Sequence, residues 1–290
     1  MVLPQDFKNK MQNLLKDEFD DFLKGYEKDN FYSLRINTLK AQLSDVLDKN
    51  LFDFTPVKWC PTGYYYPGNQ RPGRHSYHHA GVFYIQEASA MAVVECADIR
   101  HGDKVLDLCA APGGKTYTIA EEMNNTGEVL SFDIHEHRVK LIQSGAERLG
   151  LTCIKATVGD ATSFYENLGE ADAVLCDVPC SGFGIIGRKP EIKYKNPDEV
   201  KQLPSLQLQI LQTGAKYVKE GGRLVYSTCT LSHSENSKVC KRFLQSTDDF
   251  KVVSPFKDLS DDEFLTLMPH KHCTDGFFIA CFERKKQNEN

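Results

Sequence analysis

The sequence predicts a doubly wound α/β fold with a mainly parallel sheet, preceded by a small α+β unit. From about residue 99 onward, short apolar runs alternate with helical patterns, which is typical of strands buried on both faces of a parallel sheet. Acidic residues and small-residue turns follow several of these runs, at the strand ends where ligands bind in such sheets. We therefore divide the chain into a first unit, residues 1–98, and a second unit, residues 99–290.

The first unit mixes helical and strand patterns. A stretch rich in Gly, Pro and His, residues 66–81, is interpreted as a loop. The remaining elements are predicted as helices over residues 7–15, 19–27, 42–50 and 86–97 and as strands over residues 32–39, 57–59 and 63–67.

The second unit is predicted to alternate between strand and helix. Gly221 and Gly222 are expected to end its long helix, and Ser232 with Glu235 has the spacing of a capping box for the helix that follows. The strands are predicted over residues 104–108, 128–133, 153–160, 172–177, 223–228 and 276–284, and the helices over residues 114–123, 135–149, 207–222 and 235–245.

The composition is that of an ordinary globular protein. Of the 290 residues, 41% are hydrophobic and 26% are charged, and no apolar run reaches the length that a membrane span needs. The N-terminus has no apolar signal-peptide core, so we expect a cytoplasmic monomer without membrane association, whose ten cysteines are mostly reduced. The net charge of −5 argues against a generic nucleic-acid binder but allows a local basic groove.

The stretch VLDLCAAPGGKT, residues 105–116, is interpreted as a cofactor loop. Its small residues let a ligand approach the backbone and the start of the next helix. A phosphate-binding loop would need glycine where Cys109 stands, and the pattern G-x-G-x-x-G is absent. Asp107, Asp133 and Asp160 end three successive strands. Three carboxylates suit a ligand with an adenosine group and a positive centre, such as S-adenosylmethionine.

Two cysteines follow the next two strands. Asp177 and Cys180 come after the fourth strand and Cys229 after the fifth, and because these strands are expected to be neighbours, both thiols should face the cofactor crevice. A thiol is needed there for methyl transfer to cytosine C5, which becomes nucleophilic only after a thiolate adds to C6. We expect cations to favour that thiolate, and the candidates are Lys115, Arg188 and Lys189.

Metal binding is the main competing interpretation of these cysteines. Cys176 and Cys180 are separated by three residues, and neither HSYHH nor HKHC offers a recognised zinc spacing with a partner. We therefore expect no metal site, with Cys176 facing the core. The other cysteines in apolar patterns are expected to be core residues, namely Cys96, Cys109, Cys153, Cys240 and Cys281.

The assembled motifs resemble those of the Sun/NSUN family of RNA cytosine-5 methyltransferases, in particular its RsmF-like members. The resemblance runs through LRINTLK, YIQEASAM, DLCAAPGGKT, DVPCSGFG, RKPEIK, YSTCTLSHSEN and TDGFF. It implies a Rossmann-like methyltransferase domain after a unit that is similar to an RNA-recognition motif. The sequence stops soon after TDGFF, without the additional C-terminal RNA-binding region of longer RsmF-like proteins, so we expect either a compact enzyme or part of a longer one.

The resemblance also implies roles for individual residues. Cys229 would be the nucleophile, Cys180 would assist release, and Asp177 and Lys115 would complete the catalytic set. RNA contacts are expected from residues 187–195 and, in the first unit, from Arg35 and Asn37. The cofactor S-adenosylmethionine would be bound by Cys109, Ala110, Ala111, Pro112, Gly113, Gly114, Lys115, Asp133, Arg138, Asp160 and Asp177.

Three other functions remain open from the sequence. The substrate is expected to be rRNA, with tRNA as the alternative. A methyltransferase acting on a base amino group or ring nitrogen would need no thiol and often carries an aromatic residue after a D-P-P-like motif, where this chain has Cys180. A non-catalytic RNA-binding factor for ribosome assembly would bind no cofactor.

Overall fold

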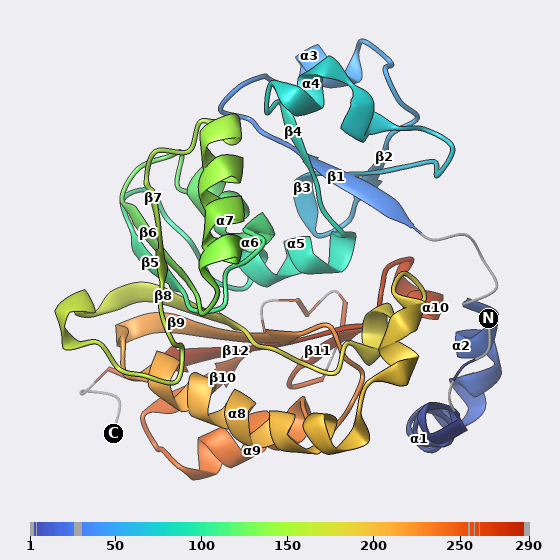
Figure 1. The fold of residues 1–290 in the computed structure, drawn as a ribbon, viewed down its shortest axis with the longest axis vertical. Helices are drawn as coiled ribbons and strands as arrows, with labels where there is room; N and C mark the ends of the chain where they lie inside the picture. The colour runs from blue at the N-terminus through green and yellow to red at the C-terminus, as the bar shows by residue number, and fades with distance from the viewer. Residues whose placement is uncertain are drawn as a thin grey trace.

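The computed structural model describes residues 3, 5–25, 31–254, 256–257, 259–260 and 262–286. Its larger sheet has the strand order β10-β12-β9-β8-β5-β6-β7, with β11 paired to β12 (Figure 1). The neighbours from β9 to β7 are parallel, and β10, β11 and β12 pair in antiparallel fashion, which confirms the predicted fold class. The strands are β5 (Lys104–Asp107), β6 (Glu128–Asp133), β7 (Ile154–Val158), β8 (Ala171–Asp177), β9 (Val218–Thr228), β10 (Phe250–Val253), β11 (Leu265–Leu267) and β12 (Phe277–Arg284).

Helices cover both faces of this sheet because successive strand residues point to opposite sides. Val105 contributes to the hydrophobic cluster beneath α5, α6 and α7, and its neighbour Leu106 to the cluster beneath α8 and α9. Figure 1 shows these two helical layers above and below the sheet. The helices are α5 (Ala88–Glu95), α6 (Gly114–Glu122), α7 (Glu136–Leu149), α8 (Pro197–Ala215) and α9 (Ser237–Gln245).

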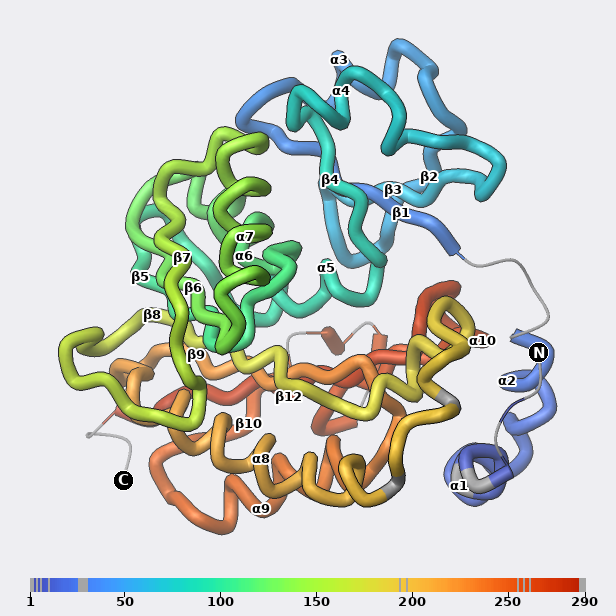
Figure 2. The backbone as a smooth tube through the Cα atoms, viewed as in Figure 1, coloured from blue at the N-terminus to red at the C-terminus, as the bar shows by residue number. Residues whose placement is uncertain are grey.

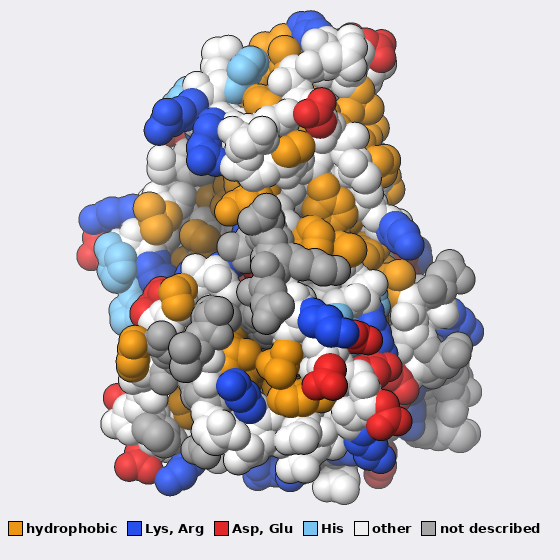
Figure 3. Space-filling view, turned by 90° about the vertical axis from the view of Figure 1, so that its right-hand side faces the viewer, with side chains coloured by type: hydrophobic (Ala, Val, Ile, Leu, Met, Phe, Trp, Pro, Cys, Tyr) orange, Lys and Arg blue, Asp and Glu red, His pale blue; other side chains and the backbone are white. Residues whose placement is uncertain are grey.

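The first unit contains a separate antiparallel sheet with the order β2-β3-β1-β4. The strand β4 (Phe83–Ile85) was not predicted, and the stretch interpreted as a loop contains the short helix α4 (Ser76–His79). The remaining elements are β1 (Tyr32–Ile36), β2 (Thr55–Val57), β3 (Cys60–Tyr66) and α3 (Leu43–Leu47). On the face shown in Figure 3, hydrophobic side chains gather near the mid-height of the molecule.

The two N-terminal helices lie apart from the four-stranded sheet. They are α1 (Gln5–Leu15) and α2 (Phe19–Gly25), and Figure 2 shows them beside the later segments of the chain. They share a hydrophobic cluster with Ile186, Leu231 and Met268 of the second unit. Glu18 also pairs with Lys271, which lies in α10 (Pro269–His272), at 2.7 Å. The end of the predicted helix 19–27 lies outside the described residues, and the boundary after residue 98 stays a prediction.

Two predictions about helix ends in the second unit were wrong. The long helix α8 ends at Ala215, and Gly221 lies within β9 with a φ of 75°. The predicted capping box does not form, because α9 begins after Asn236 and that residue makes no side-chain cap. Glu235 instead uses its carboxylate for tertiary contacts.

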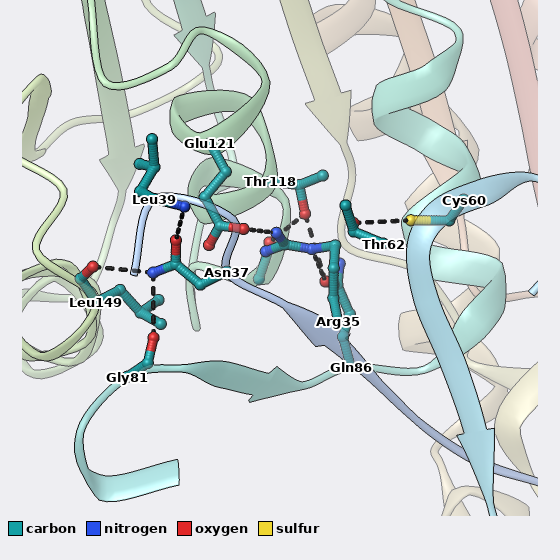
Figure 4. Close-up of polar contacts among 11 residues, drawn as sticks. Arg35, Asn37, Leu39, Cys60, Thr62, Gly81, Gln86, Thr118, Glu121 and Leu149 are labelled. Atoms are coloured by element: carbon teal, nitrogen blue, oxygen red, sulfur yellow. Dashed lines mark hydrogen bonds and ion pairs between the residues drawn. The ribbon is translucent and has the colours of Figure 1, made fainter. Parts of the chain in front are cut away.

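The expected RNA contacts of Arg35 and Asn37 were also wrong, because both side chains are buried. Arg35 Nε donates to Gln86 Oε1 at 3.2 Å, and the guanidinium pairs with Glu121 of α6 (Figure 4). Asn37 Nδ2 donates to the carbonyl oxygens of Gly81 and Leu149, at 3.1 and 3.0 Å. These residues therefore join the first unit to α6 and α7.

Candidate active site

The carboxyl ends of the parallel strands open into a cavity of about 560 Å³. Asp133, Asp160 and Asp177 border it. Cys180 and Cys229 border it together because β8 and β9 are neighbours, as expected. The residues that line it include Cys109, Ala111, Asp133, Arg138, Asp160, Asp177, Cys180, Lys189, Lys195 and Cys229.

The turn between β5 and α6 forms one wall of this cavity. Gly113 has a φ of 108°, and a Cβ atom there would lie 2.4 Å from the Tyr117 ring, so both the backbone and the packing require glycine. A second cavity of about 210 Å³ lies against the same turn and is bordered by Glu87 of the first unit. Ala110, Pro112, Gly114 and Lys115 line this smaller cavity, whereas Cys109, Ala111 and Asp177 line both.

Two of the three strand-end acids face the larger cavity. Asp133 accepts a hydrogen bond from the His135 backbone at 3.0 Å and pairs with Arg138 at 2.9 Å. Asp160 accepts from the backbone and hydroxyl of Thr162 at 2.9 and 2.7 Å. Asp107, the third of these acids, does not line the larger cavity. Its side chain is fully buried, and this burial raises its pKa to about 6. The larger cavity thus has carboxylates that neighbouring groups hold in place.

The Sγ atoms of Cys180 and Cys229 lie 3.2 Å apart, and both residues are half-buried. A hydrogen bond from the Cys180 thiol lowers the pKa of Cys229, against the opposing effect of burial. Lys115 and Lys195 also lower the pKa of Cys229. The same hydrogen bond, burial and the charge of Glu235 raise the pKa of Cys180 well above its usual range. The surroundings therefore favour a thiolate at Cys229 and a thiol at Cys180.

Lys115 and Asp177 form an ion pair beside the two thiols, with Nζ 2.7 Å from Oδ2. Ser227 Oγ donates to the other oxygen, Oδ1, at 2.6 Å. Burial alone would lower the pKa of Lys115, but the charge and hydrogen bond of Asp177 outweigh it and the pKa is raised. Lys115 thus remains a cation within the site.

The cations near the thiols are not all the ones that were expected. Arg188, expected near the thiols, pairs with Asp275 at 2.5 Å and lies over the Tyr32 ring. Lys195 was not singled out individually, although it lies in the predicted basic stretch, and its Nζ donates to the Cys180 carbonyl at 3.1 Å. Cys176 is buried, as expected from its position in the strand.

Two absences concern only the part of the chain that the structure describes. No group of three or more His, Cys, Asp or Glu side chains there could hold a metal ion. Within the same residues, no helix combines the length and apolar character needed to cross a membrane.

The fold is that of a Rossmann-like methyltransferase, and family comparisons give the same class. Residues 94–283 match the model of the 16S rRNA methyltransferase RsmB/F, and residues 3–88 match the N-terminal domain of the 16S rRNA methyltransferase RsmF. The chain therefore belongs to the RsmB/F family of methyltransferases, which confirms the resemblance inferred from the sequence. S-adenosylmethionine is the methyl donor of this family, in agreement with the expected cofactor.

Individual relatives cover most of the chain. It is 41% identical to the probable ribosomal RNA small subunit methyltransferase B of Bacillus subtilis, covering 88% of this chain and 60% of that protein. It is 33% identical to the ribosomal RNA small subunit methyltransferase F of Escherichia coli, and the match covers 97% of this chain and 63% of that protein. The chain thus spans about three-fifths of these relatives' length. A methyltransferase homologue from Pyrococcus horikoshii is 31% identical with a TM-score of 0.84, covering 96% and 94%.

Proposed function

We propose that this protein transfers a methyl group from S-adenosylmethionine to C5 of a cytosine in RNA. The observation that carries the proposal is the pair of thiols, Cys180 and Cys229, held 3.2 Å apart beside the cofactor turn. Methyl transfer to a nitrogen would need no thiol, so this pair favours carbon methylation. Lys115 and Asp177 supply the charges that such a reaction needs next to the sulfur atoms.

Cys229 is the proposed nucleophile because the family resemblance gives it this role. The charges of Lys115 and Lys195, which lower its pKa, support the choice. The Cys229 thiolate would form a bond to cytosine C6, which moves electron density to C5, and C5 would take the methyl group with S-adenosylhomocysteine as the leaving group. Transfer of the C5 proton to water would then restore the C5–C6 double bond and expel Cys229 as its thiolate. Cys180, whose raised pKa keeps it protonated, is positioned to assist that release.

The remaining site residues have roles in binding. Asp177 hydrogen-bonds the base, and the Lys115 ammonium stabilises negative charge that develops on the ring. Asp133 is suited to the ribose hydroxyls of the cofactor because it ends β6, the strand after the cofactor turn. Asp160 and Arg138 border the same cavity and would orient the cofactor there.

The proposed substrate is rRNA of the small ribosomal subunit. Support comes from the names of the matched family and relatives, and tRNA remains the alternative substrate. Lys189 and Lys195 line the cavity and are exposed, so they are suited to bind phosphates next to the target base. The cytosine must be unstacked or in a loop, because both C5 and C6 have to be reached.

The test is methylation of small-subunit rRNA by the purified protein, with 5-methylcytosine detected after bisulfite treatment. Cys229→Ala should abolish the product while calorimetry shows unchanged binding of S-adenosylmethionine. Full activity of that variant would refute the nucleophile, and methylation at a nitrogen would refute the reaction. Absence of cofactor binding by the wild type would favour the non-catalytic RNA-binding function.

A further inference from the structure

The residues that follow the two thiols are hydrogen-bonded to each other. Ser181 comes directly after Cys180 and Thr230 directly after Cys229, and their hydroxyl oxygens lie 2.7 Å apart. Both side chains are fully buried, so water does not compete for this contact. The loop after β8 and the loop after β9 are therefore tied together one residue beyond the sulfur atoms.

The Glu235 carboxylate is hydrogen-bonded to the loop that carries Cys180. One carboxylate oxygen, Oε2, accepts from the Ser181 backbone at 2.8 Å, and Oε1 accepts from the Ser181 hydroxyl at 2.7 Å. Gln207 Nε2 donates to Glu235 at 3.1 Å and to the Pro179 carbonyl at 2.9 Å. The residues on both sides of Cys180 are thus bound, directly or through Gln207, to one buried carboxylate.

Asn236, the next residue in the chain, holds the Cys229 loop in the same manner. Its Oδ1 accepts from the Thr228 hydroxyl at 2.6 Å, and its Nδ2 donates to the Thr230 carbonyl at 2.8 Å. Thr228 and Thr230 flank Cys229. Asn236 is 4% exposed, so these bonds are also shielded from water.

We propose that Glu235 and Asn236 are positioning residues that set the separation of the two sulfur atoms. This inference rests on the proposed function, in which Cys229 and Cys180 act in turn on one cytosine and must therefore reach the same ring. Neither residue contacts the reacting atoms. Glu235 fixes Cys180 and Asn236 fixes Cys229, and their adjacency in the chain couples the two loops.

The separation of the thiols can be measured without RNA or cofactor. Diamide oxidises two neighbouring thiols to a disulfide, and its nitrogen–nitrogen double bond takes up the two electrons and two protons to form a hydrazine. The rate at which Cys180 and Cys229 form this disulfide in the intact chain, followed by peptide mass spectrometry, reports how often the sulfur atoms meet. Cys180→Ser identifies the correct cross-linked peptide, because that variant cannot form it.

Two substitutions, Glu235→Gln and Asn236→Asp, keep the shape of the side chain. Glu235→Gln replaces one carboxylate oxygen that accepts from Ser181 by an NH2 group that cannot accept. Asn236→Asp replaces the NH2 group that donates to the Thr230 carbonyl by an oxygen that cannot donate. We expect each to slow the disulfide about tenfold, the effect of losing a hydrogen bond worth about 1.4 kcal/mol. In Glu235→Gln the fall is expected although loss of the Glu235 charge also lowers the pKa of Cys180, which by itself would speed oxidation. Ser234→Ala is the matched control, since Ser234 is exposed and its hydroxyl contacts Ser232, and it should cross-link at the wild-type rate.

A second pair of variants separates positioning from folding. Thr230→Val removes the hydroxyl that contacts Ser181 and should slow disulfide formation. Thr230→Ser retains that hydroxyl and should form the disulfide at the wild-type rate. The two variants are compared at equal melting temperatures, so that a difference in rate does not reflect a difference in folding. Wild-type rates in Thr230→Val, or in folded Glu235→Gln and Asn236→Asp, would overturn the inference. If the protein methylates no cytosine, the proposed function fails while the disulfide rates still decide the positioning.

Discussion

Replacement of Arg35 with Met should strongly destabilise the protein. The side chains of Arg35 and Glu121 are 1% and 4% exposed, and they form an ion pair between the first unit and α6. Removal of one partner leaves a buried carboxylate without its cation, which costs about 3–5 kcal/mol. The double variant Arg35→Met, Glu121→Leu removes both charges and should recover most of this loss.

The loss in Arg35→Met should also depend on pH. Burial raises the pKa of Glu121 above its usual 4.5 even beside Arg35, which lowers it, so removal of Arg35 raises the pKa further. When the pKa of a carboxyl group is higher in the folded state than in the unfolded state, the protein becomes less stable as the pH rises from the lower pKa to the higher one. The variant should therefore be closer to wild type at pH 5 than at pH 8.

Urea denaturation of both variants and the wild type, followed by circular dichroism at the two pH values, measures these differences. An Arg35→Met variant that loses less than about 1 kcal/mol at pH 8 would refute the reasoning, because that is the range of an exposed ion pair. A double variant as unstable as the single one would show that packing, and not charge, carries the effect.

Three further expectations concern the core, the cofactor and a second carboxylate. Gly145→Ala should lower the melting temperature, equivalent to about 1–3 kcal/mol, because its Cβ would lie 2.0 Å from the buried Tyr117 hydroxyl; an unchanged melting curve would contradict this. Asp133→Asn should weaken S-adenosylmethionine binding in calorimetry about tenfold, with unchanged affinity arguing against a ribose contact. Burial and Glu87 raise the pKa of Asp275 to about 7, so wild-type stability should fall as the pH rises from about 4 to 7, and Asp275→Asn should show a smaller fall in melting temperature over that range.

The inner parallel strands β5, β6 and β8 could be predicted because they are mostly buried and apolar. The edge strand β7 is largely exposed, with only Ala156 buried. Errors arose where tertiary contacts or special backbone geometry override local pattern. The helix α8 begins at Pro197, ten residues before the predicted start at residue 207, and it contains Pro204 although proline usually breaks a helix. Gly221 was expected to end that helix, but with its positive φ it lies within β9.

The convergence of the cysteines and acids at one edge of the sheet was easier to predict than the contacts that hold them in place. The cysteines and acids stand at strand ends, and parallel strands bring their ends to one edge. Glu235 has the local spacing of a capping residue, and only the folded chain shows its carboxylate bound to Ser181. Arg35 is a charged residue in a small unit that resembles an RNA-binding one, and the sequence carries no signal that it pairs with Glu121, 86 residues away.

The proposed chemistry is tested most directly with the Cys180→Ala variant, small-subunit rRNA and S-adenosylmethionine. If Cys180 assists release, this variant should accumulate a covalent RNA adduct that migrates slowly on a denaturing gel, and peptide mass spectrometry should locate the adduct on Cys229. The double variant Cys180→Ala, Cys229→Ala should form none. Methylated cytosine produced by the double variant, or an adduct located on a different residue, would contradict the proposed role of Cys229.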